Sequence, residues 1–411
     1  MEKFLLFLPI ENIGLTDYVQ NLSIFTICSI FMLPFLLILS KFRSTLLFNI
    51  FLVLILWMVL STIFNINIKS DVQDNLFRAV FGLIFGFSTF ILLREVFFRS
   101  NTYRVFVWLK YSFVIIIIFF IYDLVFNFYG RLRIYASYTE PSHLGNDLAL
   151  IYLPMFLLFL RNMNRMEKIF FFVSGTIIAI LTFSTTTYVK ILLFILFYLI
   201  FGQKKIASIL SFIFLAILIS GISFIFFYIY SDNYFVRILN ITLDKLGSGI
   251  EELPVTLLDR ISFWVFLFNI KNIDISMNHF TMFIFGGGLG NDSVFVKFLP
   301  HVVGEKIISI KGFGSYITSF LGRIFSYGGI VGLILYIEFI LSVLRKIKYI
   351  SFEHRERGIY TSWLIVLFLS TSFGLGPFQS IALWFLPAYV DGLSLKLKQQ
   401  SLNNNILCRN Q

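Results

Sequence analysis

The sequence predicts an all-helical membrane protein that crosses a bilayer many times. Of its 411 residues, 58% are hydrophobic and only 13% are charged, which is about half the charged fraction of a soluble domain. The apolar residues occur in long continuous runs, as membrane helices require, and do not alternate with polar residues as they do in barrel strands. This composition excludes a water-soluble enzyme and a disordered chain.

Eleven segments are apolar enough to be interpreted as membrane spans, since a helix needs about 20 residues to cross a bilayer. Residues 4–18 form a possible twelfth span, short or re-entrant, and this leaves the side of the N-terminus open. We expect no cleavable signal, because the first apolar run is short and no small-residue cleavage site follows it. In chain order, the eleven segments are 21–40, 45–66, 77–93, 105–129, 146–160, 169–187, 188–202, 206–230, 316–343, 358–376 and 378–395.

The positions of lysine and arginine predict the orientation of the chain. Of the 33 Lys and Arg residues, 19 fall on one side of the predicted spans. Short loops collect positive charge on the cytoplasmic side, so this side and the C-terminus are predicted to be cytoplasmic. The short connections of the other side hold only Lys69, Arg131, Arg133 and Lys190.

One connection is far longer than the others, and it divides the chain. Residues 231–315 form a loop of about 85 residues, and loops of this length are usually functional. The predicted orientation makes this loop extracytoplasmic. The expected organisation is an N-terminal bundle of about eight spans (1–230), the large loop (231–315), C-terminal membrane helices (316–395) and a cytoplasmic tail (396–411).

Cysteine and histidine give no sign of a metal or disulfide framework. Cys28 lies in an apolar run and Cys408 lies near the C-terminus, so a bond between them is not expected. The four histidines include no pair at helical i, i+4 spacing. The net charge of +11 does not indicate nucleic-acid binding, because so apolar a chain offers no basic face.

The first polar stretch on the outer side is 130–146, GRLRIYASYTEPSHLGN. Proline favours the first turn of a helix, so the fifth span is predicted to start at Pro141 or Ser142. Arg131 and Arg133 beside a helix N-terminus form a plausible seat for a diphosphate. In the alternative interpretation, both arginines lie in the lipid headgroup layer and Glu140 pairs with one of them.

The long loop carries a second set of candidates. Residues 257–270 are predicted to form an amphipathic helix at the membrane surface, with Arg260 either as a ligand or as a simple anchor. The motif FGGGLGND, with Gly288 and Gly290, allows positive φ angles and close backbone approach, though a tight turn between short helices explains it equally well. His301 follows Pro300 and is a candidate base, although a lone loop histidine is more often a bystander.

Arg323 and Tyr188 complete the candidates. Arg323 lies near the outer end of the ninth predicted span, where an arginine is costly and marks a functional site unless it reaches up to the interface. Tyr188 follows the hydroxyl-rich stretch TFSTTT, which is predicted to close the sixth span. Its hydroxyls can bind a sugar or diphosphate, or simply bond to the preceding helical turn.

Taken in order, these segments resemble the O-antigen polymerase (Wzy) family of bacterial surface-polysaccharide enzymes. The resemblance covers most of the chain and depends on the order of the motifs more than on any single one. The glycine motif alone is weak, whereas EPS before a span is moderately specific. The matching features are R-x-R with YTEPSHLG, TFSTTTYV, the long outer loop, Arg260 with Trp264, FGGGLG, and YGGIVGLILYI.

The related O-antigen ligases differ at one position. Their pattern has a histidine a little over ten residues before the Gly-x-x-Gly that opens a late span. Aligning that pattern on Gly329 and Gly332 places Thr318 or Ser319 where the histidine would be. This departure favours a polymerase over a ligase.

The resemblance implies a multi-pass protein of the bacterial inner membrane, with a helical bundle like that of the GT-C glycosyltransferases. The expected activity is transfer of a growing glycan from undecaprenyl diphosphate onto a new lipid-linked repeat at the periplasmic face. A protein that regulates chain length and the membrane lipid are expected partners, and nucleic acid is not. The polymer can be O-antigen, as in lipopolysaccharide, or capsule.

This reaction assigns roles to the candidate residues. Fixed cations stabilise the departing diphosphate, and a base accepts the proton of the acceptor hydroxyl. No metal or other cofactor is expected, because the outer segments contain no aspartate pair and arginines can supply the charge. The expected catalytic residues are Glu140, Arg260, His143 and His301, and the expected substrate-binding residues are Arg131, Arg133, Arg323, Tyr188, Gly288 and Gly290.

Two other functions fit the sequence less well. A ligase would transfer the finished glycan to lipid A or a protein. A flippase or other transporter would place charged residues in the middle of its spans, along a central path. Here charges are nearly absent from the middle of the predicted spans and gather on the outer side, and no internal repeat is visible.

Overall fold

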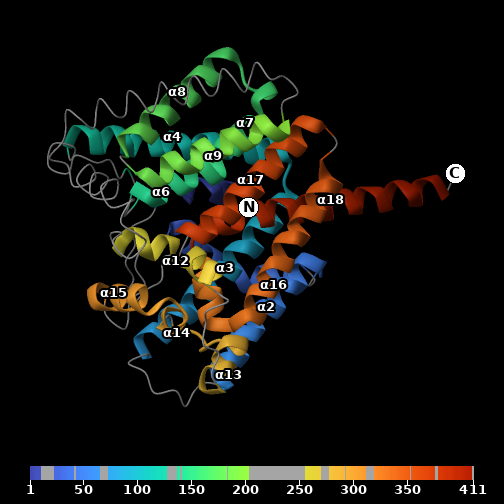
Figure 1. The fold of residues 1–411 in the computed structure, drawn as a ribbon. Helices are drawn as coiled ribbons and strands as arrows, with labels where there is room; N and C mark the ends of the chain where they lie inside the picture. The colour runs from blue at the N-terminus through green and yellow to red at the C-terminus, as the bar shows by residue number, and fades with distance from the viewer. Residues whose placement is uncertain are drawn as a thin grey trace.

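The computed structural model describes residues 1–10, 23–40, 43–64, 73–126, 136, 138, 141–182, 184–202, 255–269, 277–291, 293–311, 319–351, 353–374 and 378–409. Over these ranges the regular elements are all helices (Figure 1). They are η1 (Glu2–Phe7), α1 (Ile24–Ser40), α2 (Leu46–Phe64), α3 (Gln73–Arg99), α4 (Thr102–Phe126), α6 (Pro141–Asp147), η2 (Leu148–Tyr152), α7 (Leu153–Leu158), η3 (Leu160–Asn162), α8 (Arg165–Leu181), α9 (Thr185–Gly202), α12 (Val255–Asn269), α13 (Met277–Phe285), α14 (Ser293–Lys297), α15 (His301–Lys311), α16 (Phe320–Ile350), α17 (His354–Phe373) and α18 (Ile381–Arg409).

Ten of the eleven expected spans coincide with helices, and the remaining one, 206–230, lies outside the described residues. Among the described residues, four helices are long and apolar enough to cross a membrane by themselves: α2, the part of α3 from Leu76, α4 and α16. Two shorter apolar helices, Ile24–Ile38 and Thr186–Gly202, add to these. The all-helical class is therefore confirmed, and these helices are able to cross a membrane by length and composition, while the number of spans stays a prediction.

The fifth expected span begins at Pro141, as its sequence indicates. It is not one regular helix, because α6 passes into a π-helical turn, η2, before α7. Such wide turns are frequent at functional sites. Here the turn contains Tyr152, whose hydroxyl lies 2.6 Å from that of Ser112 on α4.

One boundary differs from the expectation. The stretch 182–190 does not close the sixth span; α8 ends at Leu181, and α9 begins at Thr185. The Thr182 hydroxyl donates to the carbonyl of Ala179 at 2.7 Å, and this bond helps to end α8. Tyr188 and Lys190 therefore belong to the first turns of α9.

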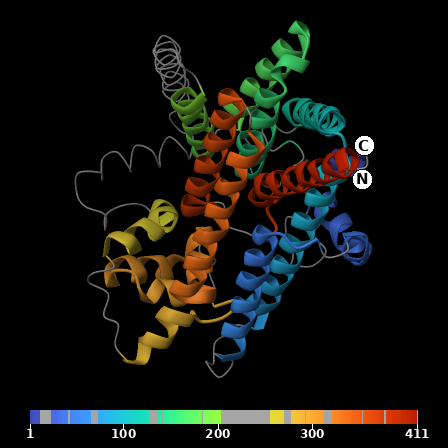
Figure 2. The same cartoon turned by 90° about the vertical axis from the view of Figure 1, so that its right-hand side faces the viewer.

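Within 231–315 the described residues form four short helices, α12 to α15, as the long-loop interpretation expects. Figures 1 and 2 show them grouped at one end of the molecule, with α4 and α8 at the other. Phe266 packs its ring 4.7 Å from that of Phe325 on α16. The indole nitrogen of Trp264 donates to the Ser372 hydroxyl on α17 at 3.1 Å. Helix α12 is thus fixed to the bundle, and Leu258 and Asp259 in its N-terminal half are buried as well.

Helix α16 is broken at Gly329, which has φ 62° and ψ −157°. The break leaves carbonyl groups without helical partners, and other elements supply donors. The indole nitrogen of Trp57 donates to the Gly328 carbonyl at 2.9 Å. The backbone N–H of Gly287 donates to the Ser326 carbonyl at 2.6 Å.

The glycine-rich loop between α13 and α14 fits into this break. A Cβ atom on Gly286 would lie 2.6 Å from the backbone nitrogens of Gly328 and Gly329. A Cβ on Gly288 would lie 2.6 Å from the Cα of Thr62 on α2. Both glycines have positive φ, so the motif allows three backbone segments to approach closely.

Candidate functional site

Seven of the ten expected site residues lie in described parts of the chain. Glu140, Arg131 and Arg133 lie outside them. The others are found on α6 (His143), α9 (Tyr188), α12 (Arg260), the glycine loop (Gly288, Gly290), α15 (His301) and α16 (Arg323).

Helices α6 and α9 meet at Gly145. A Cβ atom at this position would overlap the side chain of Thr187, so only glycine allows the contact. Thr187 is 1% exposed, and its hydroxyl has no hydrogen-bond partner among the described residues. The close approach brings the first two turns of α9 against the polar end of α6.

Lys190 lies one turn after Thr187, on the same face of α9. It is only 6% exposed, and its ammonium group donates to the side-chain carbonyl of Asn146 on α6. In the described part of the chain no carboxylate pairs with it. A buried lysine is normally paired with a carboxylate, so an amide as its partner is unusual.

Arg260 on α12 adds a second positive charge to this region. It lies close enough for its charge to act on Lys190. Two neighbouring cations repel each other, and the repulsion is strong where water is excluded. Lys190 and Arg260 therefore place positive charge on both α9 and α12, two helices that each contact α17.

The acidic end of the same region is Asp147. Its carboxylate accepts a hydrogen bond of 2.9 Å from the hydroxyl of Tyr138, and its charge acts on Tyr152 in the π-helical turn. We name Tyr138, Asn146, Asp147, Lys190 and Arg260 the outer cluster. His143 lies on the same short helix as Asn146 and Asp147.

Other expected residues lie elsewhere or have structural partners. The hydroxyl of Tyr188 donates to the carbonyl of Ile180 at 2.5 Å, which ties the start of α9 to the end of α8. Gly288 packs against α2, and Gly290 has a φ of 81° in the same buried loop. This packing gives the glycine motif a structural role, and its part in substrate binding stays a prediction.

His301 and Arg323 lie on helices that both pack against α12, the helix of Arg260. The side chain of His301 is 83% exposed, with its Nε2 atom 3.3 Å from Glu305 of the same helix. Arg323 lies just after the start of α16, which the Ser319 hydroxyl caps by accepting from the N–H of Gly322 at 3.2 Å. Helix α16 meets α12 at Phe325 and Phe266.

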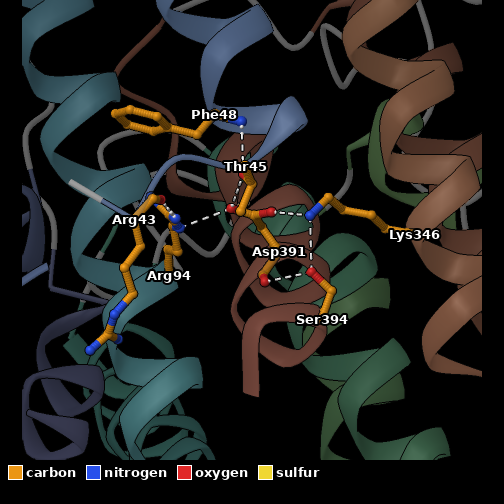
Figure 3. Close-up of polar contacts among 7 residues, drawn as sticks. All are labelled: Arg43, Thr45, Phe48, Arg94, Lys346, Asp391 and Ser394. Carbon is orange, nitrogen blue, oxygen red and sulfur yellow. Dashed lines mark hydrogen bonds and ion pairs between the residues drawn. The ribbon is translucent and has the colours of Figure 1, made fainter. Parts of the chain in front are cut away.

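A second group of buried charges lies around Asp391 on α18 (Figure 3). One carboxylate oxygen is 2.8 Å from Nε of Arg94 on α3, and the other is 2.5 Å from Nζ of Lys346 on α16. The Thr45 hydroxyl donates to the same carboxylate at 3.0 Å. The ammonium of Lys346 also donates to the Ser394 hydroxyl at 3.0 Å. We name these five residues the inner cluster.

The two clusters suit different tasks. In the inner cluster both carboxylate oxygens have cationic partners, so the group can join four chain segments but offers little to a ligand. In the outer cluster a buried ammonium still has donors to offer, since lysine carries three. Anionic oxygens are the ligands that such a site prefers. The described residues contain no group of three or more His, Cys, Asp or Glu side chains placed to hold a metal.

Sequence reasoning missed Lys190, Asn146 and Asp147 as site residues. From the sequence, Lys190 was considered only as one of the few positive charges on the outer side. A usable signal was present, because a lysine in the apolar run YVKILLFIL faces the helix side that also carries Thr187. The partner Asn146 could not be identified, since nothing local links α6 to α9.

Comparison with models of known protein families, with curated proteins and with solved structures found no match for this chain. The likeness to the O-antigen polymerases therefore stays a resemblance of motif order.

Proposed function

We propose that the chain is a polysaccharide polymerase of the bacterial inner membrane. It transfers a growing glycan from undecaprenyl diphosphate onto a new lipid-linked repeat unit. The observation that carries the proposal is the buried ammonium of Lys190, which has an amide partner and a neighbouring arginine, Arg260. This arrangement suits a leaving group that gains negative charge.

The reaction breaks the bond between the anomeric carbon of the donor sugar and a diphosphate oxygen. Both electrons of that bond go to the diphosphate. The hydroxyl oxygen of the acceptor repeat forms the new bond to the anomeric carbon and loses its proton to a base. Preorganised cations lower the barrier because charge grows on the diphosphate in the transition state.

The proposed roles follow from chemistry and position. Lys190 and Arg260 bind the diphosphate, with Arg131, Arg133 and Arg323 as further cations around the glycan carrier. Glu140 and His143 precede Asn146 in the chain and are the first candidates for the base, and His301 is the alternative. Tyr138 positions Asp147 by its hydrogen bond of 2.9 Å.

The experiment is complementation of a deletion strain, with the surface polysaccharide separated on a gel. Wild type restores a ladder of chain lengths, while Arg260→Ala and Lys190→Gln leave a core with a single repeat. Lys297→Ala is the matched control, because Lys297 is an exposed lysine of the same loop region on α14. Immunoblotting must show equal amounts of each variant in the membrane.

Other phenotypes of the deletion contradict the proposal in distinct ways. A core without any repeat, with long polymer left on the lipid carrier, identifies a ligase. Single repeats trapped on the inner leaflet identify a flippase. A full ladder from Lys190→Gln would show that the buried ammonium, on which the proposal rests, is not needed for polymerisation.

A further inference from the structure

Arg43 lies between α1 and α2, beside the inner cluster but not part of it. The Nη2 atom of Arg94 donates to the backbone carbonyl of Arg43, so the inner cluster fixes the backbone at this position. The side chain takes the opposite direction. In Figure 3 its guanidinium points away from the carboxylate of Asp391, which is already paired with Arg94 and Lys346.

The guanidinium of Arg43 is held by an aromatic ring and not by a carboxylate. Its central carbon lies 4.0 Å from the centre of the Phe98 ring on α3, a distance at which a ring face attracts a cation. Glu95, about one turn earlier on α3, pairs instead with Arg99, with 2.8 Å between Oε2 and Nε. In the part of the chain that the structure describes, no carboxylate forms an ion pair with Arg43. Its positive charge is therefore not neutralised.

The hydrogen-bond donors of this guanidinium are also unused. The Nη1 atom is buried and has no hydrogen-bond partner among the described residues. The Nε and Nη2 atoms make no hydrogen bond to the described residues either, but they are not buried, so a ligand can reach the guanidinium from their side. An arginine fork is satisfied best by the paired oxygens of a carboxylate or a phosphate.

An exposed apolar stripe on α1 leads to this point. Phe31, Phe35 and Ile38 are 75%, 62% and 75% exposed, and their spacing puts them on one face of the helix. Helix α1 ends at Ser40, and three residues of chain reach at most about 11 Å, so Arg43 lies near the end of the stripe. A molecule with an anionic head and an apolar tail can contact both.

We propose that Arg43 and Phe98 form a binding site for the phosphate group of an anionic membrane phospholipid, whose acyl chain lies along the exposed stripe of α1. The guanidinium and the phosphate are complementary in charge. Arg43 belongs to the positively charged side of the predicted spans, and the cytoplasmic leaflet carries the anionic lipids that attract basic residues. A free phosphate ion would use the guanidinium but not the stripe. This inference does not depend on the proposed polymerase function.

The test is native mass spectrometry of the purified full-length protein, titrated with phosphatidylglycerol in detergent. Wild type should bind a first phosphatidylglycerol more tightly than a first phosphatidylcholine. Arg43→Gln should weaken the affinity for phosphatidylglycerol by about 10- to 150-fold, as loss of a charge-assisted hydrogen bond does. Lys348→Gln is the matched control and should bind like the wild type, because Lys348 is an exposed cation in the last turn of α16, on the same predicted side.

Further measurements separate the fork, the ring and the charge. Arg43→Lys keeps the charge and loses the fork, so its affinity should fall less than that of Arg43→Gln. Phe98→Leu removes the ring and should weaken binding by about 2- to 5-fold, the size of an exposed cation–π contact. The wild type alone tests the charge, because added salt should weaken its affinity for phosphatidylglycerol. An affinity that salt does not change rejects the contact, whether or not the variants fold.

Several outcomes would overturn the inference. Equal affinities of wild type and Arg43→Gln show that the phospholipid binds elsewhere. An equal loss in Lys348→Gln shows a general attraction to the basic side of the protein and not a site. Equal affinity for phosphatidylcholine removes the selectivity for an anionic lipid. Inorganic phosphate that binds as tightly as phosphatidylglycerol identifies a site for the free ion and rejects the phospholipid as its occupant.

Discussion

Lys190 and Asp391 are both buried charged side chains, yet their surroundings are opposite. Asp391 is 0% exposed and has two cations, two hydroxyl-bearing neighbours and no spare oxygen. Lys190 is 6% exposed and has only an amide as its partner among the described residues. In the inner cluster the carboxylate of Asp391 is paired with two cations, whereas in the outer cluster the ammonium of Lys190 has no carboxylate partner among the described residues.

The difference teaches how to separate structural from functional charges in a membrane protein. Burying a charge is expensive, and a compensated pair can be kept for structural reasons. An uncompensated charge needs another reason, and a charged ligand is the simplest. Substitutions in the inner cluster should therefore lower stability, and substitutions in the outer cluster should lower activity.

The largest effect is expected for Asp391→Asn. The change leaves Arg94 and Lys346 without a carboxylate, and breaking a buried ion pair costs about 3–5 kcal/mol. The free energy of unfolding, measured by SDS titration in mixed micelles, should fall by that amount. Lys346→Met should cost less, because Asp391 keeps Arg94 as its partner. Equal stability of wild type and Asp391→Asn would show that the inner cluster is not structural.

The second prediction compares Lys190 with Lys346 by two measurements, the rate of glycan transfer and the free energy of unfolding. Lys190→Gln should lower the rate of glycan transfer by about 10²–10³-fold, as loss of one transition-state donor does. Its unfolding free energy should change little, because glutamine can still donate to Asn146. Lys346→Gln should do the reverse, with a lower unfolding free energy and an unchanged rate per folded molecule. Purified enzyme with lipid-linked repeats provides both measurements.

A smaller effect is expected at the edge of the inner cluster. The hydroxyl of Thr45 donates to Asp391 and also accepts from the N–H of Phe48 at 3.1 Å, capping α2. Thr45→Val keeps the shape and removes both bonds, which should cost about 1 kcal/mol. The same SDS titration measures it, with Thr176→Val on α8 as the control, since that hydroxyl only bonds to its own helix.

The smallest effect concerns a partly exposed pair outside both clusters. Lys110 lies 2.6 Å from Glu167, and its hydrogen bond lowers the pKa of Glu167 below its ordinary value. A lowered carboxyl pKa stabilises the folded state above its unfolded value, and this stabilisation is lost as pH falls through the folded pKa. Exposed pairs contribute about 0.2–1 kcal/mol.

The measurement is the unfolding free energy at pH 7 and at pH 3. Glu167→Gln should be slightly less stable than wild type at pH 7, and the difference should shrink at pH 3. A difference that grows as the pH falls would contradict the assigned direction of the pKa shift.

The sequence predicted correctly the features that depend on residues close together in the chain. Apolar runs predicted the helices, Pro141 predicted the first residue of α6, and the amphipathic pattern predicted α12. Each of these depends on neighbours within a few turns. The π-helical turn after Asp147 was not foreseen, because its residues have no distinctive composition.

The clusters depend on residues far apart in the chain, and so they escaped prediction. Lys190 and Asn146 are 44 residues apart, and Thr45 and Asp391 are 346 apart. Such pairings are decided by how helices pack, which a single sequence does not reveal. The glycine motif was ambiguous for the same reason, since its partners are the break at Gly329 and the end of α2.

The long separation within the inner cluster has a consequence for how the protein is made. A ribosome adds roughly 5–20 residues per second, so Asp391, which lies 346 residues after Thr45, emerges about 20–70 s later. During that interval Arg94 has not yet met its carboxylate partner. The cluster closes only when α18 arrives, so this part of the bundle gains its ion pairs last.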